Sequence, residues 1–182
     1  KTPALNWRYF PNLNPQLRRN NWQRAYALSP DKSLLCMGTL RGDGLLLYDW
    51  RNKHLEAIRY RKPLKPDETD VLIDALVFDP SGRLWIGTED GLLCMQQPVE
   101  SALQNHAVME PVNPITTVLG NAHVTALLVA SETLWIGTKG RGLFRMHLGT
   151  RVQEAVKPGA GLSGNSNINC LLADAAGQIW VG

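Results

Sequence analysis

Hydrophobic residues recur along this chain in short runs that are broken by turn-forming residues. One such unit spans residues 73–88, where six mostly apolar positions precede an Asp-Pro-Ser-Gly turn and then the sequence Leu-Trp-Ile-Gly-Thr. Short apolar runs between Gly and Pro signals are typical of β-strands. No window shows sustained helical spacing of apolar residues, so we expect almost no helix, with residues 99–106 as one candidate helical turn.

The unit occurs four times. Related segments occupy residues 25–39, 124–138 and 168–182, and the first of these is the weakest copy because it lacks the tryptophan. Each copy carries an anchor glycine near its end, and these glycines are Gly38, Gly87, Gly137 and Gly182. Their separations of 49, 50 and 45 residues fall in the range of β-propeller blades.

Each unit predicts one blade of four antiparallel strands. The apolar run, as in 73–78, forms the first strand, and the Leu-Trp-Ile segment, as in 84–86, forms the second after a tight turn. Third strands are expected at 44–49, 91–95 and 142–146, and more polar fourth strands at 55–60, 107–110 and 152–155. The sequence therefore predicts an all-β fold built from β-propeller blades.

Two positions of the repeat have a structural interpretation. One position in the first strand is always small, and it holds Ala25, Ala75, Ala126 and Cys170. The innermost strands of a propeller converge on its axis, where bulky side chains would collide. One position in the second strand holds Trp85, Trp135 and Trp180, with Cys36 in the first copy. We expect these indoles to pack blade against blade rather than to stack on a ligand.

The repeats are too few to close a ring. About three and a half are present, whereas a closed propeller takes roughly four to eight blades, and an open arc exposes strand edges and an apolar face. We therefore expect an incomplete propeller, whose remaining blades lie outside this chain or come from another copy of it. The expected division is a lead-in over 1–21 and a partial propeller over 22–182, with blades at about 22–70, 71–121, 122–166 and a truncated 167–182.

Composition argues against a disordered or a membrane-spanning chain. Apolar residues make up 44% and charged residues 19% of the sequence, and the mean hydropathy is −0.18. No apolar stretch reaches the roughly 18 residues of a spanning helix, so we expect membrane contact only through segments outside this chain. The chain opens on Lys1 rather than Met, which we interpret as a processed or cut chain.

Charge is unevenly distributed around a net value of +3. Residues 1–65 carry a net charge of +9 and residues 66–182 a net charge of −6. The basic third could contact phosphates or an acidic ligand, but a solvated basic surface is the more common arrangement. We expect no nucleic-acid partner.

The sequence shows no catalytic or metal-binding motif. The four histidines form no His-x-x-x-His pair, and no His or acid stands at ligand spacing from a cysteine. The glycine-rich segment 137–142 lacks the spacing of a phosphate-binding loop and opens no helix, so it is interpreted as a turn. We expect no catalytic residues, no metal, no cofactor and no enzymatic activity for this chain.

Polar loop residues suggest a binding site instead. In a propeller, the loops between second and third strands and those between blades gather on one face, where a rigid scaffold presents them. The candidates are Arg41, Asp43, Glu89, Asp90, Lys139, Arg141, His123, Asn165 and Asn167, and the same loops contain Asp70 and Asn121. Their chemistry suits sugar hydroxyls or an acidic saccharide, and ordinary solvated turn residues are the alternative.

The repeat resembles the two-component regulator propeller repeat. The resemblance rests on the apolar strand, the Asp-x-x-Gly turn, the Leu-Trp-Ile-Gly-Thr and Gly-Leu segments, and on the Gly-Leu-Ser-Gly-Asn-Ser-Asn-Ile-Asn run that begins at Gly161. It covers residues 22–182, is strong in the last three copies, and is absent from residues 1–21. It implies a seven-bladed periplasmic sensor region of a hybrid histidine kinase or diguanylate cyclase, followed by a membrane helix and a cytoplasmic output domain. The resemblance also implies an oligosaccharide ligand and signalling through a phosphorelay.

These observations favour a sensor domain of a two-component-type signalling protein that binds a small polar ligand outside the cytoplasmic membrane. The alternative is a non-catalytic propeller scaffold for protein–protein interaction. A lyase or hydrolase on the same scaffold is a third hypothesis, because fold alone does not decide function.

Overall fold

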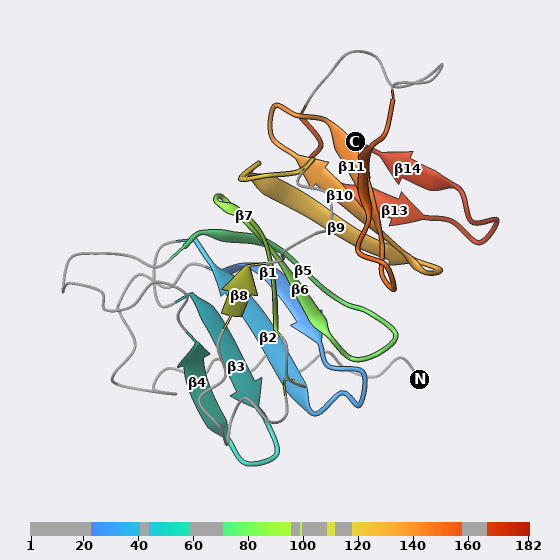
Figure 1. Cartoon of the computed structure of the whole chain (residues 1–182). Helices are drawn as coiled ribbons and strands as arrows, with labels where there is room; N and C mark the ends of the chain where they lie inside the picture. The colour runs from blue at the N-terminus through green and yellow to red at the C-terminus, as the bar shows by residue number, and fades with distance from the viewer. Residues whose placement is uncertain are drawn as a thin grey trace.

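The computed structural model of the chain describes residues 23–40, 44–58, 71–95, 99, 109–111, 118–157 and 167–182. These residues form fourteen β-strands (Figure 1). Of the candidate helical turn at 99–106, only Val99 lies in the described residues, where it is helical. The expected lead-in segment lies outside them. The all-β prediction is therefore confirmed.

The strands form three antiparallel four-stranded sheets and one hairpin, each in simple sequence order. Blade 1 contains β1 (Gln23–Leu28), β2 (Leu34–Thr39), β3 (Leu45–Asp49) and β4 (His54–Ile58). Blade 2 contains β5 (Ile73–Phe78), β6 (Leu84–Thr88), β7 (Gly91–Met95) and β8 (Met109–Pro111). Blade 3 contains β9 (Val124–Ala130), β10 (Thr133–Thr138), β11 (Leu143–His147) and β12 (Gln153–Ala155). The hairpin pairs β13 (Leu171–Ala173) with β14 (Ile179–Val181).

The first strands of successive sheets lie next to one another. Strand β1 contacts β5, β5 contacts β9, and β9 contacts β13, and in each four-stranded sheet the fourth strand lies at the edge opposite the first (Figure 1). This arrangement of meandering sheets around their first strands is that of consecutive propeller blades. The predicted blade architecture is therefore confirmed.

The anchor glycines explain how neighbouring blades fit together. A Cβ atom added to Gly38 would lie 2.4 Å from Ile73 Cγ2 of blade 2, and one on Gly87 would lie 2.6 Å from Val124 Cγ1 of blade 3. Gly137 has the same relation to Ile168, at 2.6 Å. Each second strand thus needs glycine because the next blade inserts a β-branched side chain at that point.

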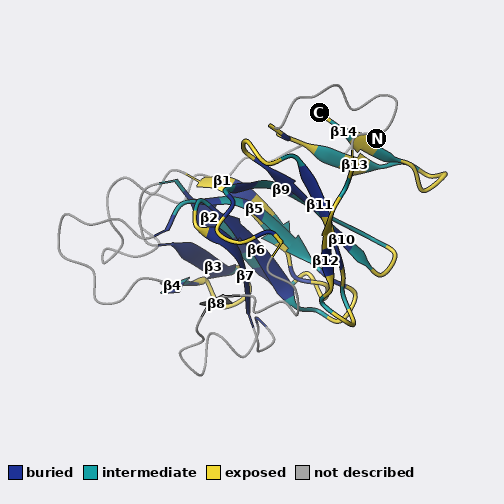
Figure 2. Cartoon of the chain, turned by 45° about the horizontal axis from the view of Figure 1, so that its top comes forward, coloured by how far each residue is buried: buried dark blue, intermediate teal, exposed yellow. Residues whose placement is uncertain are grey.

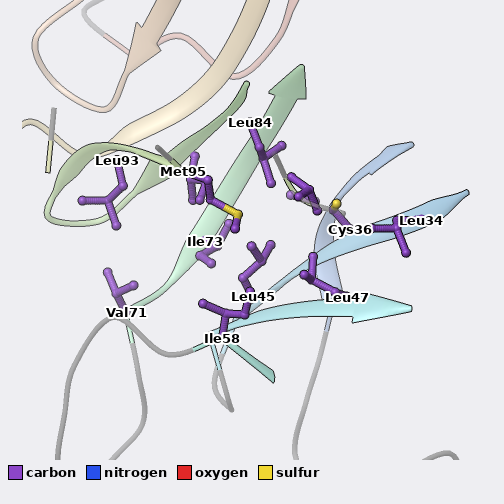
Figure 3. Close-up of a cluster of buried hydrophobic side chains, with 13 residues drawn as sticks. Leu34, Cys36, Leu45, Leu47, Ile58, Val71, Ile73, Leu84, Leu93 and Met95 are labelled. Atoms are coloured by element: carbon purple, nitrogen blue, oxygen red, sulfur yellow. The ribbon is translucent and has the colours of Figure 1, made fainter. Parts of the chain in front are cut away.

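Apolar side chains form clusters between the blades, and the strands that contribute them are mostly buried (Figure 2). Figure 3 shows the cluster between blades 1 and 2, where Cys36 and Leu45 of one sheet meet Ile73 and Leu84 of the other. The next cluster contains Trp85, which is fully buried against residues of blade 3. Burial of such side chains contributes about 1.5–3 kcal/mol each, so these interfaces dominate the stability of the fold.

The turn after the first strand is built around an aspartate in two of the copies. Asp79 Oδ1 accepts hydrogen bonds from the amides of Ser81 and Arg83, and its Oδ2 accepts one from the Trp85 indole at 3.0 Å. Asp174 binds the Trp180 indole in the same way, at 2.9 Å. Both aspartates thus form Asx turns, which also fix the orientation of Trp85 and Trp180.

The last hairpin departs from the expected burial. Trp180 is 59% exposed, although Trp85 at the same position of the repeat in blade 2 is fully buried. Cys170 is also exposed. The physical reason is that Trp85 is covered by blade 3, whereas within the described residues no further sheet covers this face of β13 and β14. For Cys170, the expectation of a core position is therefore wrong in this structure.

Candidate functional site

The first strand of each blade carries an extra residue at its beginning. In β5, Ile73 pairs with Thr88 and Ala75 pairs with Gly87, so Asp74 has no partner on β6. The same shift leaves Arg24 unpaired in β1 and Thr125 unpaired in β9. Such β-bulges redirect a side chain away from the regular alternation of a strand.

The hairpin repeats this geometry. The amides of Asn169 and Cys170 both donate to the carbonyl oxygen of Gly182, at 2.6 and 3.0 Å, which places the extra residue at Asn169. All four extra residues are polar, although the strands that contain them are largely apolar: they are Arg24, Asp74, Thr125 and Asn169. We call the end of the sheets at which these residues lie the polar end.

Asp74 connects three blades at the polar end. Its Oδ2 lies 2.6 Å from His123 Nε2, at the start of blade 3, and its Oδ1 lies 3.0 Å from Arg24 Nε of blade 1. The Asp74 side chain is only 5% exposed, whereas Arg24 is 52% and His123 24% exposed. One nearly buried carboxylate thus lies beneath two cationic or potentially cationic groups.

The burial of Asp74 makes this arrangement energetically sensitive. Its Oδ1 is buried and accepts no hydrogen bond, so the ion pair with Arg24 is the contact that offsets the cost of burying this oxygen. A buried carboxylate that loses its partners is strongly destabilised. Loss of the contact with Arg24 or His123 is therefore expected to weaken the junctions between the three blades.

Thr125 makes the corresponding connection between blade 3 and the hairpin. Its hydroxyl lies beside the carbonyl oxygen of Ile168 and 3.2 Å from that of Gly137. Because a hydroxyl has one proton, it donates to one of these acceptors at a time. Every junction between described blades thus has a polar contact from a bulge residue at the polar end.

The structure also places the predicted second-to-third-strand turns at the polar end. The Glu89 amide donates to the Leu72 carbonyl, and Glu89 Oε1 accepts from the Leu72 amide at 3.2 Å. The Lys139 amide donates to the carbonyl of His123 at 2.9 Å. The turns of blades 2 and 3 therefore lie against the segment that leads into the first strand of the same blade, as expected from propeller geometry.

The predicted site residues differ in their hydrogen bonds and in their exposure. The Asp90 amide donates to Thr88 Oγ1, and both Lys139 and Asn167 are exposed. Asn121 is exposed in the segment before His123. Four predicted residues lie outside the described residues, namely Arg41, Asp43, Asp70 and Asn165.

The Arg141 side chain is fixed by contacts with the segment that leads into the first strand of its own blade. Its two terminal nitrogens donate to the carbonyls of Leu119 and Val118, at 2.6 and 3.0 Å, and its guanidinium lies 5.7 Å from the Phe144 ring centroid. These contacts fasten the segment that carries His123. The ligand-binding role predicted for Arg141 stays a prediction, and the geometry gives this residue a positioning role in addition.

The bulge residues Arg24, Asp74, Thr125 and Asn169 were missed by sequence reasoning. The signal was available, because each of them stands directly before the small residue of the first strand. A polar residue at a fixed place in an apolar strand indicates a bulge or a binding position. The contacts that these residues make across blades could not be read from the repeat.

The described residues contain neither a metal-binding cluster nor a membrane-spanning helix. No group of three or more His, Cys, Asp or Glu side chains in these ranges is arranged to hold a metal ion. Within the same ranges, no helix has the length and apolarity to cross a membrane.

Comparison with protein families identifies the repeat. The two-component regulator propeller repeat matches the chain at residues 67–90 and again at 161–182. These two matches coincide with the second copy and the last copy of the repeat. No curated protein shows significant similarity to the chain.

Solved structures share the fold. The extracellular domain of BT3049 from B. thetaiotaomicron, assigned to the hybrid two-component systems, is 19% identical with a TM-score of 0.59 over 86% of this chain and 18% of its own. PorZ, a surface component of the type-IX secretion system of Porphyromonas gingivalis, is 18% identical with a TM-score of 0.64 over 96% of this chain and 27% of its own.

An enzyme has a similar fold. Virginiamycin B lyase from Staphylococcus aureus is 6% identical, with a TM-score of 0.62 over 90% of this chain and 50% of its own. At such identities the similarity concerns the fold alone, which supports sensors, secretion components and enzymes. The chain spans about a fifth to a quarter of the length of the two-component and secretion proteins.

Proposed function

Because two-component regulator propeller repeats recur in this chain, we propose that it forms part of the ligand-sensing region of a bacterial two-component-type signalling protein. The chain supplies consecutive blades of a larger, seven-bladed propeller, which is non-catalytic. Output comes from a kinase or cyclase domain elsewhere in the protein, and membrane contact comes from segments outside this chain.

The observation that carries this proposal is the set of polar bulge residues at one end of an apolar scaffold. Asp74 is nearly buried there and bridges Arg24 and His123 from the two flanking blades. A ligand that binds these groups better in one arrangement of the blades than in another shifts the equilibrium between the arrangements. The polar end therefore combines groups that can bind a ligand with contacts through which binding can change the packing of the blades.

The proposed ligand is small and polar, with a saccharide as the favoured class. His123 lies next to the exposed turn residue Lys139, whose amide donates to its carbonyl, and Arg24 shares the Asp74 carboxylate with His123. These groups offer several hydrogen-bond donors to hydroxyl or carboxylate oxygens. We place the site outside the cytoplasmic membrane, in the periplasm, where such ligands arrive.

Thermal unfolding in the presence of neutral and acidic oligosaccharides tests the proposal. A ligand at about 100 times its dissociation constant stabilises a protein by about 2.7 kcal/mol, which raises the melting temperature measurably. We expect the shift to be lost in Arg24→Gln and His123→Gln and to persist in Lys32→Gln, an exposed residue in the turn between β1 and β2, at the opposite end of the sheet.

Two results would count against a sensor. A shift that survives both substitutions would place the ligand elsewhere on the chain. The absence of any shift with the saccharides, together with a full-length gene that lacks a membrane helix and a kinase or cyclase domain, would favour the scaffold for protein–protein interaction. Turnover of a saccharide would favour an enzyme.

A further inference from the structure

A pocket lies between blades 2 and 3 at the end of the sheets opposite the polar end. It is lined by the turn after β5 (residues 79–83), the turn after β9 (residues 131–132) and the segment after β11 (residues 148–149). Its volume is about 260 Å³. We call it the turn pocket. Because both blades contribute walls, its shape depends on how these blades pack.

One wall of the turn pocket carries a positioned cation. The guanidinium carbon of Arg83 lies 5.5 Å from the Trp85 ring centroid, and its Nε lies 3.8 Å from Asp79 Oδ2. The indole is fully buried and hydrogen-bonded to the same carboxylate, so the surface beneath Arg83 is rigid. None of the described residues accepts a hydrogen bond from the Nη nitrogens of Arg83, which remain able to bind a carboxylate.

The wall from blade 3 carries a negative charge. The Glu132 side chain is 85% exposed, and its Oε2 lies 3.4 Å from His147 Nε2. The backbone of this wall is held by the Leu148 amide, which donates to the Glu132 carbonyl at 2.9 Å. A cation on one blade and a carboxylate on the next therefore border the same small pocket.

Between these charges the pocket is apolar. Pro80 and Leu148 contribute the apolar surface, and the backbone of Gly149 completes the lining. The volume is below that of pockets for drug-sized molecules, so an oligosaccharide does not fit inside it. A ligand that matches the pocket is small, has both charges, and has an apolar group.

We propose that the turn pocket binds a free α-amino acid with an apolar side chain. The Arg83 guanidinium receives the carboxylate, Glu132 receives the ammonium group, and Pro80 and Leu148 cover the side chain. This site is separate from the polar end, and it would let a second small molecule favour one packing of blades 2 and 3.

Isothermal titration calorimetry of the 182-residue chain with L-leucine and L-phenylalanine tests the proposal. Isocaproate lacks the ammonium group and leucinamide lacks the carboxylate, and we expect each to bind at least about tenfold more weakly. We expect Arg83→Gln and Glu132→Gln to weaken binding of L-leucine by a similar factor. Arg145→Gln and Glu154→Gln are the matched controls, since this exposed ion pair lies outside the pocket.

Binding of L-leucine that is lost in both pocket variants and kept in both controls would support the site. The proposal is overturned by the absence of measurable binding at about 10 mM amino acid, or by equal affinity for isocaproate. Unchanged binding in Glu132→Gln would also overturn it, and this exposed substitution stays informative if Arg83→Gln reduces folding. The saccharide experiment reports on the polar end, so either proposal can fail without the other.

Discussion

At the scale of single residues, Asp79 shows how one side chain organises a turn and a core residue together. Burial by itself would raise the pKa of Asp79, but the hydrogen bonds from Ser81, the Arg83 amide and the Trp85 indole outweigh it and lower the pKa below its usual 3.8. The ionised carboxylate therefore stabilises the folded chain.

Replacing Asp79 tests this account. In Asp79→Asn, the amide group retains one acceptor oxygen, so at least one of the donors loses its partner. We expect the free energy of unfolding at neutral pH to fall by about 1–3 kcal/mol, measured by urea denaturation.

The pH dependence gives a second readout of the same variant. Because the folded pKa is depressed, the stabilisation is present above pH 3.8 and is lost as the pH falls from that value through the lower folded pKa. The native chain should lose stability over this range more steeply than Asp79→Asn. Parallel stability curves for the two proteins would show that Asp79 is not the responsible group.

At the scale of elements, the interlocking of neighbouring strands holds the blades in register. The second strand of one blade leaves out a side chain where the first strand of the next blade inserts one. Gly87 and Val124 form such a pair at the junction of blades 2 and 3. The backbone at Gly87 is not left-handed, so the requirement for glycine is one of space alone.

A double-mutant cycle can measure this interlock. Gly87→Ala places a methyl group 2.6 Å from Val124 Cγ1, and we expect a loss of about 1–3 kcal/mol from overpacking. Val124→Ala removes the opposing methyl groups, so the double variant should lose less stability than the sum of the losses in the two single variants. Strict additivity in chemical denaturation would show that the two residues do not compete for one space.

Sequence periodicity predicts the elements well and the site only in part. The first three strands of each blade follow from apolar runs, and the Gly-Thr pair marks where the second strand ends and the following turn begins. The short fourth strands begin or end one or two residues from their expected bounds, because their polar sequences carry little pattern. Asp74 and Arg24 could not be paired in advance, since their contact depends on how separate sheets pack.

At the scale of the whole molecule, the outer face of the last hairpin is the least covered apolar surface among the described sheets. Leu172 and Trp180 pair across β13 and β14, and they are 63% and 59% exposed. The same position in blade 2 is buried by a following blade. An apolar face of this kind favours association with another sheet.

Association of the chain in solution tests this expectation. We expect the 182-residue chain to self-associate with increasing concentration in sedimentation velocity experiments, because burial of the indole and leucine side chains is favourable. Trp180→Glu should shift the distribution towards the monomer, whereas Trp50→Glu, at a partly exposed position in blade 1, should not. Identical distributions for all three proteins would mean that the hairpin face does not drive association.

The extra residue at the start of each innermost strand also has an evolutionary consequence. Since the bulge places Arg24, Asp74 and Thr125 outside the regular strand pairing, a different side chain at these positions need not alter the strand register or the space beside the interlocked glycines. Specificity can then diverge by combinatorial change at a few positions while the architecture stays constant. If these positions bind the proposed ligand, gene duplication of such units would yield proteins that differ in what they recognise long before they differ in shape.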